Sequence, residues 1–308
     1  MTAKPYWWRA TLLLALVAAI AQVALGGVVR VTGSGDACPD WPLCHGQIIP
    51  PFDLNIWLEF THRLSATALG VLVLAGTLMA WRQMPSAKTS VLAANAALAL
   101  VVVAALLGGL TVLTELAWWA RLIHLVLAEL VVACIAVAWL AGPGEVPSTR
   151  KSGRLRPGTG LTRTVGMVSL AAVLAAIVFG SYMVGFNYGA ACTSWPMCQG
   201  MRIPDGLAFL VNMGHRISAA AIALPIAWLC VRAWRLGPQA RQARWFALLA
   251  AACLVAAMIL GALMVWLNFS ILMRSLHLVI ATLVWVSTVG LVFVLADPIH
   301  FRARFAAE

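Results

Sequence analysis

Eight long apolar segments dominate this sequence and limit the folds that it can adopt. They cover roughly residues 9–29, 58–81, 89–113, 120–141, 164–185, 207–231, 245–267 and 271–296. Each is close to the about 20 residues that an α-helix needs to cross a bilayer. Hydrophobic residues make up 63% of the chain and charged residues only 10%, which is unlike a soluble domain. The sequence therefore predicts an all-α polytopic membrane protein with eight transmembrane helices, the first a retained span and not a removed signal peptide.

The net charge of +11 is distributed in a way that argues against nucleic-acid binding. Fifteen of the 21 basic residues lie in the termini and in the connections on one side of an eight-span arrangement. This positive-inside bias predicts that both termini are cytoplasmic. The other basic residues lie at or near the outer side and need another role: Arg30, Arg63, Arg121, Arg202, Arg216 and Arg274.

The two halves of the chain repeat the same rare residues at a constant spacing. An offset of 154 relates the cysteines, and an offset of 153 relates the histidines and their neighbouring arginines. The repeated residues are Cys38, Cys44, His62, Arg63, Arg121 and His124, matched by Cys192, Cys198, His215, Arg216, Arg274 and His277. We expect two four-helix halves, residues 1–142 and 164–308, joined by a cytoplasmic basic linker at 143–163. Since each half has an even number of spans, the halves should be parallel and related by a pseudo-two-fold axis along the membrane normal.

The four repeated histidines fall near the outer ends of even-numbered spans. Ionisable side chains are costly in a membrane and are usually functional. Two imidazoles from facing helices can ligate a haem iron on its two faces, whereas zinc would need three or four ligands close together. The pattern predicts one haem site between His62 and His124 and another between His215 and His277. For any single histidine, the alternative is an interfacial residue bonded to neighbouring backbone.

Arginines accompany every one of these histidines. Arg63 and Arg216 directly follow a histidine, and Arg121 and Arg274 precede one by three residues. Arginine is suited to bidentate pairing with carboxylates, so these four are predicted to bind the haem propionates. The alternative is that they only extend to the lipid headgroups.

One acidic residue breaks the symmetry between the halves. Glu59 precedes His62 by three residues and shares its helix face, whereas the equivalent position in the second half is Asn212. A carboxylate beside a porphyrin can accept a proton or stabilise a developing cation. The halves are therefore expected to differ, with chemistry in the first and a permanent cofactor in the second. Alternatively, Glu59 only pairs with Arg63. Glu129, in the fourth span, has no assigned role.

The four repeated cysteines form two pairs in the long outer loops, where disulfides persist. The Trp-Pro sequence inside each loop favours a turn that brings the thiols together. Disulfides between Cys38 and Cys44 and between Cys192 and Cys198 are expected. A thiol–disulfide relay that carries electrons is the alternative.

The eight spans, the cysteine loops, the matched histidines and the Glu-x-x-His-Arg motif at Glu59 to Arg63 resemble the haem A synthase family over nearly the whole chain. The resemblance implies oxidation of the ring methyl of haem O to the formyl group of haem A, by successive hydroxylation, for terminal cytochrome oxidases. It implies that His215 and His277 ligate a resident haem b, that His62 and His124 bracket the substrate haem O, and that Glu59 is catalytic.

The resemblance also implies a setting in the cell. It implies a multi-pass protein of the bacterial cytoplasmic membrane, with its cysteine loops outside, that receives haem O from a haem O synthase. The sequence identifies neither the electron acceptor nor the oligomeric state, and a homo-oligomer is compatible with it.

Two other functions fit part of the pattern. A bis-histidine dihaem b cytochrome would pass electrons within the membrane and would need no Glu59. A haem transporter or chaperone would be expected to hold its ligands near the bilayer midplane, whereas these histidines lie toward the outer face.

Overall fold

The computed structural model describes residues 7–83, 85–142, 160–199 and 206–296. Regular structure in these ranges consists of long α-helices and two short 3-10 helices. In order they are α1 (Trp7–Thr32), α2 (Leu54–Gln83), α3 (Lys88–Leu113), α4 (Trp118–Leu140), α5 (Gly160–Gly185), η1 (Tyr188–Ala191), α6 (Leu207–Arg235), η2 (Pro238–Ala240), α7 (Arg241–Trp266) and α8 (Ile271–Ala296).

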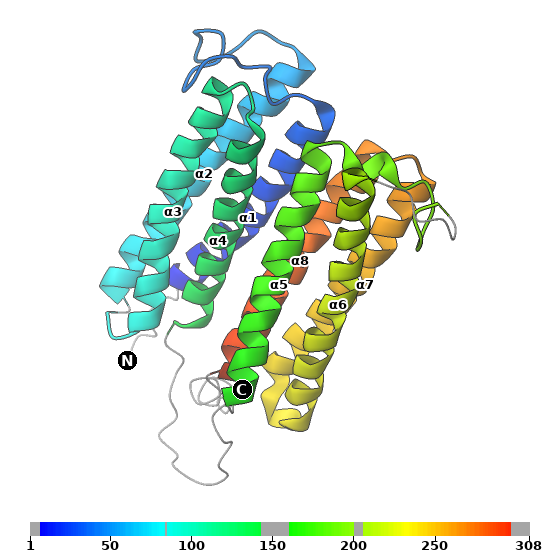
Figure 1. Cartoon of the computed structure of the whole chain (residues 1–308). Coiled ribbons are helices and arrows are strands. Elements are labelled where there is room, and N and C mark those ends of the chain that lie inside the picture. Colours follow the sequence, from blue (N-terminus) through cyan, green and yellow to red (C-terminus); the bar gives the residue numbers. More distant parts are fainter. Residues whose placement is uncertain (1–6, 84, 143–159, 200–205, 297–308) are drawn as a thin grey trace.

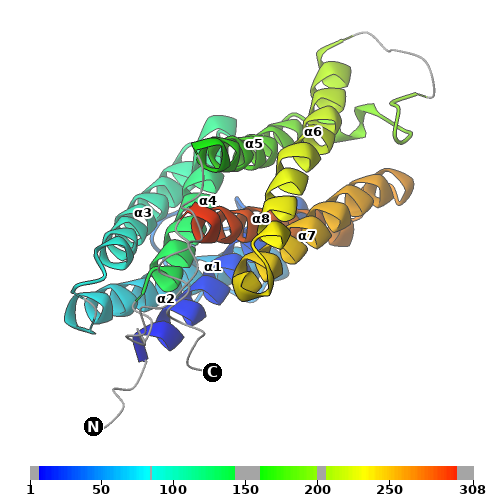
Figure 2. The same cartoon turned by 90° about the horizontal axis from the view of Figure 1, so that it is seen from below.

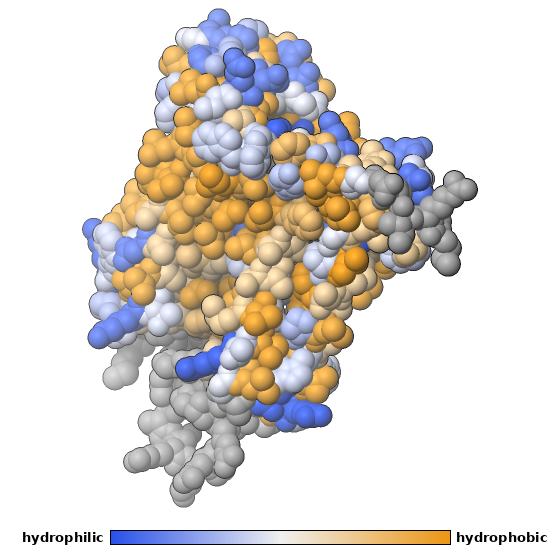
Figure 3. Space-filling model, viewed as in Figure 1, coloured by the Kyte–Doolittle hydropathy of each residue, from blue (hydrophilic) through white to orange (hydrophobic). Residues whose placement is uncertain are grey.

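The predicted all-α fold with eight spans is confirmed: eight helices are long and apolar enough to cross a membrane. A helix suits this environment because it satisfies its own backbone hydrogen bonds without water. The face of the molecule seen in Figure 3 has a broad apolar zone with hydrophilic residues toward both ends. The protein is therefore built as a multi-pass membrane protein.

Helix ends differ from the predicted spans by up to four residues, mostly by extension. The last turn of α6 includes Arg232 and Arg235, and α7 begins at Arg241. Helical backbone continues past the apolar run because long basic side chains can reach polar surroundings from a helix end. The predicted linker 143–163 lies outside the described residues up to 159, and α5 already begins at Gly160.

The helices run side by side, with α1 to α4 in one group and α5 to α8 in the other (Figures 1 and 2). In the first group α1 packs on α2 and α4, and α3 packs on α4. The second group repeats these pairs, with α5 on α6 and α8, and α7 on α8. This repetition agrees with the pseudo-two-fold relation between the halves, which stays a prediction.

The halves meet through α1, α4, α5 and α8. Buried side chains of one apolar cluster fill this region, including Ala15 and Ala19 of α1, Val132 and Ile135 of α4, and Val284 of α8. Small residues such as the two alanines allow helix backbones to approach closely in lipid. The interface therefore holds the even-numbered helices α4 and α8, each with a repeated histidine, near each other.

The two cysteine loops lie at the same end of the bundle, and α1 begins and α8 ends at the opposite end (Figure 1). Both loops contain a disulfide, Cys38–Cys44 in the first and Cys192–Cys198 in the second, as expected from the sequence. Which side of the membrane the loops face stays a prediction.

Candidate functional site

Each of the four repeated histidines packs against a glycine of the preceding helix. The glycines are Gly26 of α1, Gly108 of α3, Gly180 of α5 and Gly261 of α7, beneath His62, His124, His215 and His277 respectively. A Cβ added at Gly26 or Gly180 would lie 2.9 Å from the imidazole Cε1, and one at Gly108 would lie 3.2 Å away. At Gly261 the distance would be 3.5 Å. The first three glycines therefore give the rings space that a methyl group would occupy.

The histidines of each half are brought together, as predicted. The ring centroids of His215 and His277 lie 6.4 Å apart at an interplanar angle of 70°. His62 and His124 are also close enough to interact electrostatically. All four are half-buried near the loop end of their helices. Each half thus brings together two imidazoles from two different helices.

The Nδ1 atoms of these imidazoles have two kinds of surroundings. Those of His124, His215 and His277 are buried, and no group meets hydrogen-bond geometry with them in the described ranges. Each of these rings interacts more loosely with a backbone carbonyl of the helix beneath it. By contrast, His62 Nδ1 lies 2.9 Å from the side-chain nitrogen of Gln22. The sequence pattern did not single out Gln22, although its departure from the equivalent Ala176 was a signal for it.

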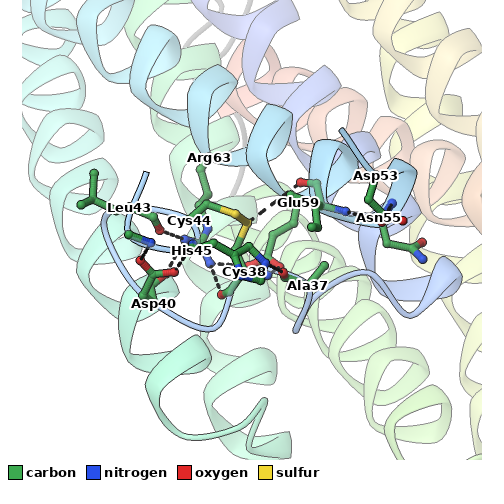
Figure 4. The surroundings of a disulfide bond; sticks show 12 residues. Ala37, Cys38, Asp40, Leu43, Cys44, His45, Asp53, Asn55, Glu59 and Arg63 are labelled. Carbon is green, nitrogen blue, oxygen red and sulfur yellow. Dashed lines mark hydrogen bonds and ion pairs between the residues drawn. A yellow bond between two sulfur atoms is a disulfide. The ribbon is translucent and has the colours of Figure 1, made fainter. Parts of the chain in front are cut away.

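Glu59 lies beneath the first cysteine loop and is tied to it (Figure 4). Its side chain is only 3% exposed. Oε2 accepts a hydrogen bond of 2.8 Å from the backbone N–H of Cys38, and Oε1 pairs with the guanidinium of Arg63. The ion pair between Glu59 and Arg63, which the sequence offered as an alternative role for Glu59, is present. The Glu59 carboxylate in this pair is buried. The carboxylate is therefore held in a fixed position one helical turn from His62.

Arg63 also holds the first cysteine loop. Its guanidinium donates to the backbone oxygens of Cys38, Asp40 and Leu43 at 2.8, 2.6 and 2.7 Å. The Asp40 carboxylate closes the loop from the other side by accepting hydrogen bonds from the N–H groups of Gly46 and His45, and the bond from Gly46 is the largest cause that lowers its pKa. The loop is thus anchored on α2 through Arg63.

The second half repeats this anchoring with different chemistry at one position. Asn212, also 3% exposed, donates hydrogen bonds of 2.9 Å to the backbone oxygens of both Tyr188 and Gly189. Arg216 donates to the backbone oxygens of Ser194 and Pro196 at 2.7 and 3.0 Å. Glu59 therefore accepts a hydrogen bond from the backbone, whereas Asn212 at the equivalent position donates hydrogen bonds to the backbone. Only the first half has an acid at this position.

Arg121 and Arg274 differ from Arg63 and Arg216 in having no hydrogen bond or ion pair from their side chains to other described residues. The Nε of Arg121 is buried. Both act electrostatically on Arg30, whose guanidinium crosses between the halves to bind Ser181 Oγ and the Ser181 backbone oxygen at 2.6 and 2.7 Å. Three arginines thus gather near the seam of the two halves, a setting suited to an anionic ligand.

Glu129 lies in the contact between the halves. It is fully buried, and its Oε1 accepts a hydrogen bond of 2.7 Å from Thr282 of α8, while its backbone oxygen accepts one of 2.8 Å from the indole of Trp285. Glu129, which had no assigned role from the sequence, therefore links α4 of the first half to α8 of the second half through hydrogen bonds.

Comparisons with known proteins agree with this arrangement. The model of the cytochrome oxidase assembly protein family, COX15-CtaA, matches residues 9–289. A heme A synthase of Bacillus licheniformis is 29% identical over 212 residues, which is 68% of either chain. The heme A synthase of Geobacillus kaustophilus is 26% identical over 255 residues, covering 82% of this chain and 80% of the relative. That of Geobacillus thermodenitrificans is 25% identical over 280 residues, covering 88% and 85%.

The family match runs from the first helix to the last and includes every repeated cysteine, histidine and arginine. The alignments with the heme A synthases cover up to 88% of the chain, so the similarity is not confined to one half. The chain therefore belongs to the haem A synthase family, COX15-CtaA, of cytochrome oxidase assembly proteins.

Proposed function

We propose that the protein is a membrane enzyme that oxidises the ring methyl of haem O to the formyl group of haem A. The observation that carries this proposal is the buried Glu59 one helical turn before His62, where the second half has a buried Asn212. Sites that only conduct electrons would need no such acid. The names of the relatives, heme A synthase, support the same product. The protein would act in the bacterial cytoplasmic membrane and would receive haem O from a haem O synthase.

The second histidine pair is assigned to a resident haem b. These two imidazoles would hold the haem iron between two different helices, and histidine is an established ligand of haem iron. The observed separation of His215 and His277 is 6.4 Å. Since both Nδ1 atoms are buried against the preceding helices, Nε2 is the nitrogen assigned to iron. When bound, haem b supplies a redox-active iron that can carry electrons away from the substrate.

The propionates of the two haems would be held by arginines. Arg121 and Arg274 are the stronger assignments because no hydrogen bond or ion pair to another described residue already occupies their guanidinium groups. Arg63 and Arg216 were predicted for the same role. Each already anchors a cysteine loop, so a propionate would have to share the guanidinium with backbone oxygens.

Glu59 is assigned the proton chemistry of the first half. Each hydroxylation removes an electron pair and protons from the methyl carbon and the attacking water, and an external acceptor takes the electrons. Two hydroxylations give a geminal diol, which loses water to give the aldehyde. A carboxylate fixed one helical turn from His62 can accept a proton or stabilise the electron-poor carbon. Its bonds to Cys38 and Arg63 keep the carboxyl group in a fixed place.

Production of the protein in cells that make haem O but no haem A tests the function. We expect haem A to appear in the membranes and the purified protein to contain haem b together with haem O or haem A, separated chromatographically after extraction. Haem b alone, with no haem A in the cells, would point to the electron-transfer cytochrome. Unchanged haem O without resident haem b would point to the transporter.

Alanine substitutions at two of the glycines test whether haem binding depends on the space beside the imidazole. In Gly180→Ala the new methyl would lie 2.9 Å from His215 Cε1, so the imidazole must shift and the haem b content should fall about tenfold. In Gly261→Ala the methyl would lie 3.5 Å from His277 Cε1, which is ordinary contact, and the haem content should be unchanged. The haem-to-protein ratio of the purified variants measures both. Equal losses in the two variants would contradict this account of the rings.

A further inference from the structure

Gln22 of α1 contacts the imidazole of His62 in a way that the other three histidines do not share. Its Nε2 lies 2.9 Å from His62 Nδ1 and donates a hydrogen bond of 2.9 Å to the backbone oxygen of His62. Its Oε1 accepts a hydrogen bond of 2.6 Å from Ser65 Oγ. Gln22 precedes Gly26, the glycine beneath the same ring, by one helical turn. The whole amide is therefore occupied by the turn of α2 that contains His62.

These contacts determine which way the amide faces and where the imidazole proton lies. A backbone carbonyl oxygen can only accept, so the amide atom that faces it must be the nitrogen. The second hydrogen of this nitrogen is available for His62 Nδ1. In a neutral imidazole, a nitrogen that accepts a hydrogen bond carries no proton, and the proton is then on the other nitrogen. His62 is thus held with its proton on Nε2.

The other three histidines have the opposite surroundings. One helical turn before their glycines lie Ala104, Ala176 and Ala257, and each ring interacts with the backbone carbonyl of its alanine. No side-chain donor reaches their Nδ1 atoms from the described part of the chain. Without a donor at Nδ1, the imidazole proton can lie on that nitrogen and leave the Nε2 lone pair for a metal.

We propose that Gln22 makes His62 a weak, exchangeable axial ligand, whereas Ala176 leaves the equivalent His215 a strong one. The inference rests on the proposed function and deepens it, since it says how one half can release its haem while the other retains it. To bind iron through Nε2, His62 must move its proton and give up the hydrogen bond from Gln22. A substrate that enters and a product that leaves need such a site, and a resident cofactor does not.

A reciprocal exchange between the halves tests the proposal. Gln22→Ala gives the first half the residue of the second, and Ala176→Gln does the reverse. Haem release from the purified protein to an excess of a haem-scavenging apoprotein is followed by absorbance. We expect Gln22→Ala to slow release from the first half by about 10–100-fold and to add low-spin bis-imidazole absorption, because second-shell partners change metal affinity by that range. Ala176→Gln should speed release from the second half similarly. Unchanged release in both variants would overturn the proposal.

Two further measurements separate the hydrogen bond from packing. Gln22→Leu keeps most of the side-chain volume without a donor and should behave like Gln22→Ala; wild-type release from it would overturn the proposal. Nitrogen-15 spectra of histidine-labelled, haem-free protein should show Nε2 protonation for His62 and its loss in Gln22→Leu. A His62 signal with the proton on Nδ1 in the wild type would contradict the assigned tautomer.

The proposed function fails separately from this inference. If His277→Ala keeps the full haem content, the assigned haem ligands are wrong, whatever the Gln22 variants do. If His277→Ala loses its haem while the Gln22 and Ala176 variants release haem as the wild type does, only the role of Gln22 is wrong.

Discussion

Replacing Glu59 with glutamine is expected to lower the rate of haem A formation by about 10²–10⁴-fold, the usual contribution of a positioned acid or base. Glutamine has nearly the same size, and its carbonyl oxygen can still accept the hydrogen bond from the Cys38 N–H. It cannot take up a proton at neutral pH. The rate is measured as haem A formed per amount of protein in membranes supplied with haem O.

The bonds between Glu59 and the cysteine loop call for a control that disturbs only the loop. Asp40→Ala removes the carboxylate that accepts hydrogen bonds from His45 and Gly46 but leaves Glu59, Arg63 and the disulfide in place. We expect this variant to form haem A at close to the wild-type rate. If it were as slow as Glu59→Gln, the carboxylate would act by holding the loop, and the catalytic assignment would be wrong.

His277→Ala is expected to lose nearly all of the resident haem b. The variant removes one of two facing imidazoles, and the remaining His215 would offer the iron a single axial bond. Removal of a ligand affects a metal site more than the 10–100-fold effects of second-shell changes. The measurement is the haem-to-protein ratio of protein that still elutes as a single species in detergent.

His45→Ala is a suitable control for the loss of a histidine. His45 lies in the first cysteine loop, where its imidazole is hydrogen-bonded to the backbone oxygen of Ala37. The equivalent position in the second half is not a histidine. This variant should keep the full haem content. A His277→Ala protein with as much haem as His45→Ala would show that the second pair does not hold iron.

Much of the fold and of the histidine arrangement could be predicted because both depend on periodic or repeated features. Apolar runs of bilayer length give the helices. The offset of 153 relates His62 to His215 and His124 to His277, so the two halves place their histidines at equivalent positions. Helix ends were less predictable, since charged residues such as Arg241 continue the helix beyond the apolar run.

The contacts of the loops could not be predicted from spacing. Arg63 and Arg216 follow histidines, which suggested propionates, but the loops fold back over α2 and α6 and bring backbone oxygens to both guanidinium groups. Such contacts depend on the path of an irregular segment, which no periodicity describes. Gln22 was hidden for another reason, because a single polar residue in an apolar run has meaning only when its repeat partner Ala176 is compared with it.

The hydrogen bond between Glu129 and Thr282 joins two residues that occupy equivalent positions, 153 residues apart. In an assembly of two identical four-helix chains, a residue at such a point would meet its own copy, so glutamate would face glutamate. Two buried carboxylates at that distance repel each other. Fusing the copies into a single polypeptide removes the requirement for identity, so a hydroxyl donor can stand opposite a carboxyl acceptor. A single chain can therefore keep a hydrogen bond between unlike side chains at this contact, where a homodimer would need a self-complementary side chain.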